Sequence, residues 1–243
     1  MSFVAPTAVL FDLDDTLSDL LGCVRAGVIG TAARHAATFA GVPTEQLEAL
    51  HSEILEETHV RVLAGEVTMA AARVERTQRF FAAWGVELDP DEAEAEYLHY
   101  RQDYDAAGGV VRGTYELLDA IDALGVRMGI ITNNLVAEQH RKLRSLDLFD
   151  RFEMLAISEE VGVPKPDPHI FNVALDRMSL GTDDVVMVGD SLTSDVAGAL
   201  GVGIATVWLD RHGHGPGVAP AELQAVVTGD WTDTDAAVAA ILG

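Results

Sequence analysis

Short, almost continuously apolar runs alternate along this chain with stretches of helical periodicity, and this alternation limits the fold more than any other feature. Near-continuous apolarity over a few residues suits strands that are covered on both faces, as in a parallel sheet. Helical patterns such as residues 115–124 and 170–178 would supply the crossovers. The pattern predicts an α/β fold with a doubly wound, Rossmann-like parallel sheet. The predicted strands are residues 8–11, 126–131, 154–157, 185–188 and 204–209.

One long interval interrupts the alternation and is helical throughout. Apolar residues recur at helical spacing from Leu20 onward. Further along, Asp89, Pro90 and Glu92 have the order of an N-cap, a first-turn proline and a capping-box glutamate. We therefore predict a four-helix cap domain at 18–109, inserted into a core domain made of 1–17 and 110–243.

Polar residues that could bind a ligand or take part in catalysis follow four of the predicted strands. The carboxyl ends of parallel strands meet at one edge of the sheet, where ligands bind in doubly wound folds. These residues should therefore converge in space, although each alone has a structural explanation such as a helix cap or a solvated charge. In chain order they are Asp12 and Asp14, Thr132 and Asn133, Lys165, and Asp190 with Asp195.

The stretch FDLDDTL at residues 11–17 crowds three carboxylates, Asp12, Asp14 and Asp15. Two unit charges about 4 Å apart repel by roughly 4 kcal/mol at an effective dielectric constant near 20. A cation or a proton must offset that repulsion. Lys165 is a candidate, because the chain has only two lysines and this one is flanked by prolines.

The overall composition argues against several functional classes. A formal net charge of −23 argues against a nucleic acid polymer and against an anionic membrane surface as partners. The single cysteine, Cys23, allows no intramolecular disulfide and has the flanks of an inert core thiol. Without a signal-like start or a long apolar stretch, we expect a cytoplasmic protein.

The motifs together resemble those of the haloacid dehalogenase-like (HAD) superfamily. Residues 12–16 fit its Asp-x-Asp-x-Thr motif, Thr132 its second motif and Lys165 its third, and residues 189–191 with Asp195 fit its fourth. The match extends over essentially the whole chain, including an insert that looks like a type 1 helical cap. Longer core segments look like the branch that contains pyrimidine-type 5′-nucleotidases and N-acylneuraminate 9-phosphatases.

The resemblance implies a Mg²⁺-dependent phosphatase that acts through an aspartyl-phosphate. Asp12 would be the nucleophile, and Asp14 the acid that protonates the leaving oxygen and then the base that activates water. Thr132, Lys165 and backbone N–H groups near Asn133 would hold the phosphoryl oxygens. The implied metal residues are Asp12, Asp14 through its main-chain carbonyl, Asp190, and Asp195 as a ligand or as a partner of one.

The resemblance also leaves alternatives. A 2-haloacid dehalogenase has the same fold but lacks the second aspartate, so Asp14 favours a phosphatase. Phosphoglycolate phosphatase and sugar-phosphate mutase activities remain open. A receiver-like phospho-aspartate regulator is a non-enzyme alternative, although receivers are shorter and lack a cap. We expect a nucleotide 5′-monophosphate or sugar phosphate as substrate, and a monomer or homodimer.

Overall fold

The computed structural model describes residues 5–243 and divides the chain into two compact units, each described here by itself. One unit comprises residues 1–19 and 109–243, and the other comprises residues 20–108. The domain bounds predicted from the sequence were 1–17, 110–243 and 18–109. No helix of the described residues is long and apolar enough to cross a membrane.

The larger unit is built on a parallel sheet with strand order β3-β2-β1-β4-β5-β6. This arrangement confirms the α/β, doubly wound sheet predicted from the sequence. The chain builds the sheet outward from β1 in both directions, with β2 and β3 on one side and β4, β5 and β6 on the other. The strand order therefore reverses at β1. The strands are β1 (Ala8–Phe11), β2 (Arg127–Thr132), β3 (Met154–Ile157), β4 (Val185–Gly189), β5 (Ala205–Asp210) and β6 (Ala225–Thr228).

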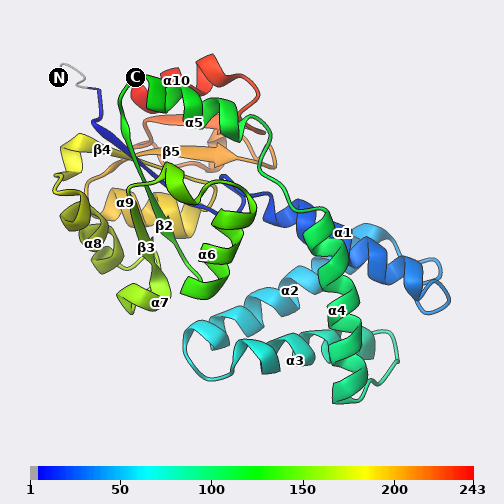
Figure 1. Cartoon of the computed structure of the whole chain (residues 1–243). Coiled ribbons are helices and arrows are strands. Elements are labelled where there is room, and N and C mark those ends of the chain that lie inside the picture. Colours follow the sequence, from blue (N-terminus) through cyan, green and yellow to red (C-terminus); the bar gives the residue numbers. More distant parts are fainter. Residues whose placement is uncertain (1–4) are drawn as a thin grey trace. The chain divides into compact units, whose positions relative to one another are not determined.

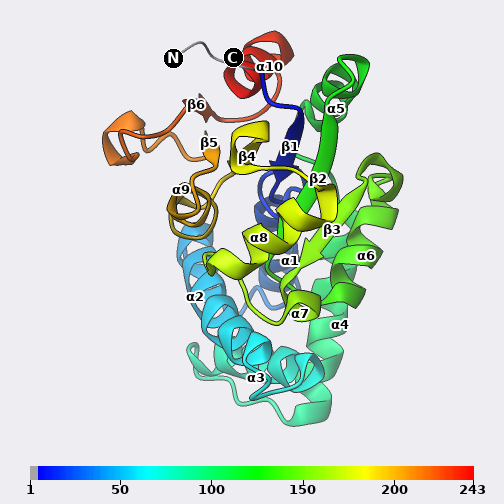
Figure 2. The same cartoon turned by 90° about the vertical axis from the view of Figure 1, so that its left-hand side faces the viewer.

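Helices cover both faces of this sheet, as Figures 1 and 2 show. They are α5 (Thr114–Ala123), α6 (Val136–Ser145), α7 (Ser158–Val161), α8 (Pro168–Met178), α9 (Ala197–Gly201) and α10 (Thr234–Leu242). Short turns are η1 (Phe149–Arg151), η2 (Thr182–Asp184), a π turn η3 (Leu192–Val196) and η4 (Pro216–Val218).

The side chains of β1 show why the sheet needs both layers. Val9 and Phe11 join a core cluster with residues of α5 and α10, whereas Ala8 and Leu10 join a second cluster with residues of α8. Alternate residues of a strand point to opposite faces, so a continuous apolar run buries both faces. The core therefore lies in two layers, one on each side of the sheet.

The sequence prediction missed one strand and shifted the ends of others. β6 was not expected, because it is short, only partly buried and paired with β5 alone. Edge strands lack the continuous apolarity that marks central strands. β2 and β5 each begin and end one residue later than predicted, so Thr132 closes β2 rather than following it.

The smaller unit consists of α1 (Leu20–Arg34), α2 (Thr44–Leu63), α3 (Met69–Ala82) and α4 (Pro90–Ala106). Its own core includes Phe39, Phe80 and Phe81. The predicted capping box is confirmed at the start of α4, where Asp89 and Glu92 satisfy backbone N–H groups.

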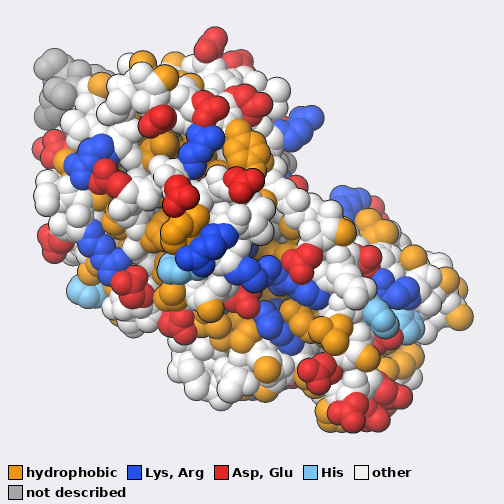
Figure 3. Space-filling view, in the orientation of Figure 1, with side chains coloured by type: hydrophobic (Ala, Val, Ile, Leu, Met, Phe, Trp, Pro, Cys, Tyr) orange, Lys and Arg blue, Asp and Glu red, His pale blue; other side chains and the backbone are white. Residues whose placement is uncertain are grey.

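Charged side chains lie mainly at the surface. Figure 3 shows acidic side chains spread over the visible face with basic side chains among them, as expected for a chain with a net charge of −23. The charged residues that are buried are few and include Asp12, Lys165 and Asp195. Burial of charges is costly unless they are paired, so buried charged residues that lie together mark a candidate functional site.

Candidate active site

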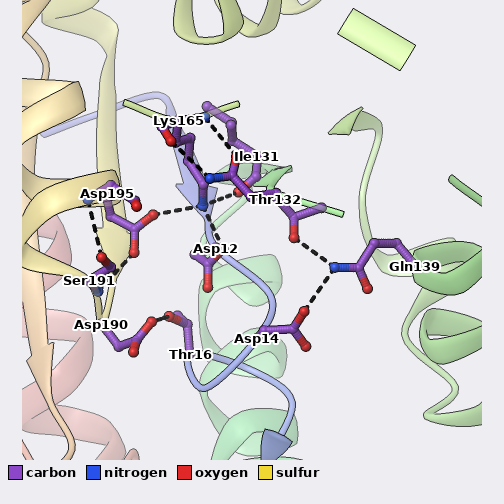
Figure 4. Close-up of polar contacts among 12 residues, drawn as sticks. Asp12, Asp14, Thr16, Ile131, Thr132, Gln139, Lys165, Asp190, Ser191 and Asp195 are labelled. Atoms are coloured by element: carbon purple, nitrogen blue, oxygen red, sulfur yellow. Dashed lines mark hydrogen bonds and ion pairs between the residues drawn. The ribbon is translucent and has the colours of Figure 1, made fainter. Parts of the chain in front are cut away.

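The polar residues picked out from the sequence meet at the carboxyl edge of the sheet, beside β1, where the strand order reverses (Figure 4). Asp12 directly follows β1, and Asp190 directly follows β4. Thr132 is the last residue of β2, and Asp195 lies in η3 just beyond β4. Parallel pairing aligns the ends of β1, β2 and β4, so residues distant in sequence become neighbours.

Lys165 contacts several of these residues at once. Its Nζ donates to Asp12 Oδ1 at 2.5 Å, to Asp195 Oδ1 at 2.6 Å and to the Ile131 carbonyl at 2.7 Å. The Lys165 side chain is only 2% exposed. Burial alone would lower the pKa of Lys165, but the two carboxylates outweigh it and raise that pKa. Lys165 is therefore a fixed positive charge at this edge.

The side chain of Asn133 binds the Lys165 backbone. Its Nδ2 donates to the Lys165 carbonyl at 2.9 Å, and its Oδ1 accepts the Lys165 N–H at 2.7 Å. Both functional ends of the amide are thus used on one residue. The side chain of Asn133 is therefore oriented by the Lys165 backbone, and the backbone N–H of Asn133 is the simpler donor for a phosphoryl group, which narrows the expectation from the sequence.

Asp12, Asp190 and Asp195 form an acidic cluster, with one carboxylate oxygen from each within 4.8 Å of the others. Burial, together with the neighbouring carboxylates, raises the pKa of Asp12 well above its usual range, although Lys165 opposes this. Burial and Asp195 likewise raise the pKa of Asp190 to about 6. Ionisation of these two buried carboxyls is therefore unfavourable without a further positive charge beside them, and a cation would supply that charge.

The three members of the acidic cluster are not equivalent. Asp195 Oδ1 binds Lys165, and Asp195 Oδ2 accepts the backbone N–H of Ser191 at 3.0 Å. The carboxylate of Asp190 accepts a long hydrogen bond, 3.4 Å, from the Thr16 hydroxyl and has no hydrogen bond with Lys165 among those of the described residues. A Cβ on Gly189 would lie 2.3 Å from Asp195 Oδ2, so this position needs glycine. Asp12 and Asp190 could therefore hold a metal ion more directly than Asp195, whose carboxylate anchors Lys165.

All the atoms that the acidic cluster offers to a metal ion are carboxylate oxygens, and such ligands fit a hard divalent cation such as Mg²⁺. Two carboxylates with raised pKa values would bind such an ion in their ionised form. The residues present thus fit the metal that the sequence motifs imply.

Asp14 lies on the other side of the loop from Asp190 and is bound by side chains of α6. Gln139 Nε2 donates to Asp14 Oδ2 at 2.9 Å, Lys142 Nζ forms an ion pair with Asp14 Oδ1, and Ser18 Oγ donates to Oδ1 at 3.0 Å. Burial would raise the pKa of Asp14, but Lys142 and these hydrogen bonds outweigh it and lower that pKa. Asp14 is therefore an ionised carboxylate in the ligand-free protein.

Asp15, the third crowded carboxylate, occupies a turn. Its backbone φ of 61° is in the left-handed region, which Asp tolerates better than most residues. Its carboxylate faces Arg211 at 3.8 Å, and Arg211 also pairs with Asp19 at 3.0 Å. The three carboxylates of FDLDDTL therefore have different partners, so their mutual repulsion is offset separately.

Sequence reasoning missed Gln139 and Lys142 as partners of Asp14. One signal was available, because Lys142 and Lys165 are the only lysines in the chain. Gln139 and Lys142 are also three residues apart on a helix, the spacing that places two side chains on one face.

Comparison with known proteins gives consistent matches. Residues 6–203 match the model of the haloacid dehalogenase-like hydrolases. A glyceraldehyde 3-phosphate phosphatase of Pyrococcus abyssi is 32% identical over 205 residues, which are 82% of this chain and 79% of that protein. The pyrimidine 5′-nucleotidase YjjG of Escherichia coli is 45% identical over 103 residues, 41% of this chain and 44% of YjjG.

A solved structure shares the fold. It is the HAD-hydrolase YfnB of Bacillus subtilis bound to magnesium, which superposes with a TM-score of 0.71 over 92% of this chain and 95% of that one at 22% identity.

Proposed function

Since the chain belongs to the haloacid dehalogenase-like hydrolases, we propose that it is a Mg²⁺-dependent phosphatase that hydrolyses a small phosphomonoester through an aspartyl-phosphate on Asp12. The observation that carries this proposal is that two carboxylates follow the same strand, β1, and have different surroundings. Asp12 is buried beside Lys165 in the acidic cluster, whereas Asp14 is held apart by α6. One carboxylate can attack while the other transfers protons.

The reaction proceeds in two displacements. A carboxylate oxygen of Asp12 bonds to phosphorus as the bond from phosphorus to the leaving oxygen breaks, and Asp14 gives its proton to that oxygen. Water then attacks phosphorus and passes a proton to Asp14, which releases inorganic phosphate and restores Asp12. Because Asp14 is ionised in the free protein, it takes its first proton from solvent as the negative phosphoryl group binds beside it and raises its pKa.

One fixed charge and two fixed hydrogen-bond donors hold the phosphoryl group during both steps. Lys165 supplies a buried positive charge. The Thr132 hydroxyl oxygen already accepts an N–H from Gln139 at 2.8 Å, which leaves the hydroxyl hydrogen for a phosphoryl oxygen. The backbone N–H of Asn133 is a further donor. Donors fixed before the reaction stabilise charge that develops in the transition state.

Mg²⁺ would be held by Asp12, Asp190 and the main-chain carbonyl of Asp14, with Asp195 supporting Lys165. When bound, it neutralises charge on the phosphoryl oxygens. Asp12 and Asp190 have raised pKa values that a divalent cation would lower. The cluster therefore supports the metal assignment independently of the sequence motifs.

We propose residues 18–109 as a cap that selects the substrate, which is a nucleotide 5′-monophosphate or a sugar phosphate. The similarity to a glyceraldehyde 3-phosphate phosphatase over most of the chain supports a small phosphorylated sugar. The more local similarity to a pyrimidine 5′-nucleotidase supports a nucleotide. The alternative of a 2-haloacid dehalogenase is disfavoured by Asp14, which attack on carbon does not require.

A phosphate-release screen over 5′-nucleotides, sugar phosphates and phosphoglycolate, with Mg²⁺ and with EDTA, tests the proposal. We expect Mg²⁺-dependent release that disappears in Asp12→Asn. Unchanged turnover in Asp12→Asn would exclude Asp12 as the nucleophile. Metal-independent release of chloride from 2-chloropropionate would instead establish the dehalogenase alternative.

A further inference from the structure

Helix α6 presents two side chains, Gln139 and Lys142, to the carboxylate of Asp14, and we call them the α6 pair. They bind different oxygens, since Gln139 Nε2 donates to Oδ2 and Lys142 Nζ pairs with Oδ1. Gln139 is completely buried, and the side chain of Lys142 is only 14% exposed. Burial of a charge and an amide is costly unless both are paired. Here both are paired with the same carboxylate, so the contact is a specific one.

The Gln139 amide has its orientation fixed by its neighbours. Its nitrogen donates one hydrogen to Asp14 and the other to Thr132 Oγ1, at 2.9 Å and 2.8 Å (Figure 4). The opposite orientation would place the amide oxygen against a carboxylate oxygen, which repels it. In the adopted orientation Gln139 Oε1 is buried without a hydrogen-bond partner among the described residues. The molecule thus tolerates an unsatisfied oxygen to keep both N–H groups on these two residues.

We propose that the α6 pair are positioning residues that hold the Asp14 carboxylate in the direction from which it protonates the leaving oxygen. The inference deepens the proposed function and rests on it, because it assigns no role without proton transfer by Asp14. Gln139 additionally ties this carboxylate to Thr132, so that the proton donor and the phosphoryl-binding hydroxyl keep a fixed separation.

The physical basis is the freedom that Asp14 would otherwise have. Its side chain is 18% exposed and lies in a loop rather than in a strand. Gln139 holds Oδ2, whereas Lys142 and Ser18 share Oδ1. The charged contact from Lys142 is the strongest of the three, so without it the carboxylate can shift away from the leaving group although the two neutral hydrogen bonds remain. General acid catalysis contributes roughly 10²–10⁴-fold, and a misplacement of about 1 Å can cost on the order of 10²-fold. Loss of the α6 pair should therefore remove much of the acid contribution while the nucleophile stays in place.

Two substrates with different leaving groups separate this role from a general structural one. The leaving oxygen of p-nitrophenyl phosphate is stable as an anion and needs no proton, whereas an alkoxide leaving group does. The comparison substrate is uridine 5′-monophosphate or glyceraldehyde 3-phosphate, whichever the wild-type protein hydrolyses faster. The measured quantity is kcat/KM, which reports only the steps up to departure of the leaving group.

Lys142→Met should lower kcat/KM for the alkyl ester roughly tenfold to a hundredfold more than for p-nitrophenyl phosphate. Lys142→Arg, which keeps the charge, should recover most of this difference. Arg141→Met is the matched control, since it removes a positive charge from the same helix at a side chain that is 47% exposed. If Lys142→Met does not fold, Lys142→Gln must show the same selective loss.

Equal losses on the two esters, or no loss on either, would overturn the inference while wild-type hydrolysis leaves the proposed function standing. Failure of the wild-type protein to hydrolyse any phosphomonoester would overturn both. Gln139→Leu adds a second readout, because it also frees Thr132. It should weaken competitive inhibition by inorganic phosphate, and unchanged inhibition would refute the link between Asp14 and Thr132.

Discussion

Replacement of Lys165 by methionine should destabilise the metal-free protein strongly and make its stability depend on Mg²⁺. The side chain is 2% exposed and offsets the charges of Asp12 and Asp195. Methionine keeps most of the volume, so the change removes charge rather than packing. Breaking a buried ion pair by removing one partner typically costs about 3–5 kcal/mol.

Two further estimates agree with this range. The oxygens of the acidic cluster lie within 4.8 Å of one another, where two unit charges repel by about 3–4 kcal/mol at an effective dielectric constant near 20. The variant can avoid the repulsion by binding one more proton, which costs roughly 4 kcal/mol at pH 7 for a carboxyl with an ordinary pKa near 4. We therefore expect Lys165→Met to lose about 4 kcal/mol at pH 7.

The pH dependence has a definite sign. Folded Lys165→Met holds one proton more than its unfolded chain, so its stability relative to the wild type increases as the pH falls. The deficit should shrink by roughly 1.4 kcal/mol per pH unit, to about 1–2 kcal/mol near pH 5. Added Mg²⁺ should reduce it in a similar way, because the ion supplies the missing positive charge.

The assay is urea unfolding in EDTA at about pH 7 and about pH 5, repeated with Mg²⁺ at the higher pH. Lys142→Met is the control, because Asp14, the ion-pair partner of Lys142, keeps hydrogen bonds from Gln139 and Ser18. We expect it to lose about 2 kcal/mol or less. A Lys165→Met protein as stable as the wild type at pH 7 in EDTA would refute the electrostatic account of the cluster.

Three other changes test separate parts of the structure. Gly189→Ala places a Cβ 2.3 Å from Asp195 Oδ2, so kcat/KM should fall on the order of 10²-fold, and wild-type activity would contradict the close packing. Asn133→Ala removes both hydrogen bonds to the Lys165 backbone and should cost about 1–3 kcal/mol in urea unfolding, with no loss counting against that role. Burial lowers the pKa of His51 from 6.5 to about 4, so below about pH 6.5 the unfolded chain binds a proton that the folded protein does not. Relative to His51→Leu, the wild type should therefore lose about 2 kcal/mol between pH 7 and pH 5, and parallel curves for the two proteins would contradict this.

The central strands were predictable because both of their faces are buried. Residues 8–11 and 154–157 were predicted with the bounds that the structure shows. β6 was not predictable in this way, since its residues are partly exposed at the sheet edge. The alternation of short apolar runs and helices indicated the doubly wound sheet, because few other folds bury so many short apolar runs.

Convergence of the polar residues could also be predicted, because parallel pairing aligns strand ends whatever the details of packing. The position of Lys142 against Asp14 could not, since it depends on how α6 packs on the sheet. The role of the Asn133 side chain could not be predicted from the sequence either. Its position after β2 suggested phosphoryl binding, but only the structure shows that its amide is bound to the Lys165 backbone.

The most direct test of the account is detection of the phosphoryl group on Asp12 during turnover. The Asp14→Asn variant is mixed with p-nitrophenyl phosphate and Mg²⁺ and quenched in acid, and its peptides are analysed by mass spectrometry. Its first step needs no acid with this leaving group, whereas its second step lacks a base, so the intermediate should accumulate. The account predicts the mass of one phosphoryl group on the peptide that contains Asp12, and none in the Asp12→Asn, Asp14→Asn double variant. Release of p-nitrophenol without that label, or with the label on another residue, would contradict it.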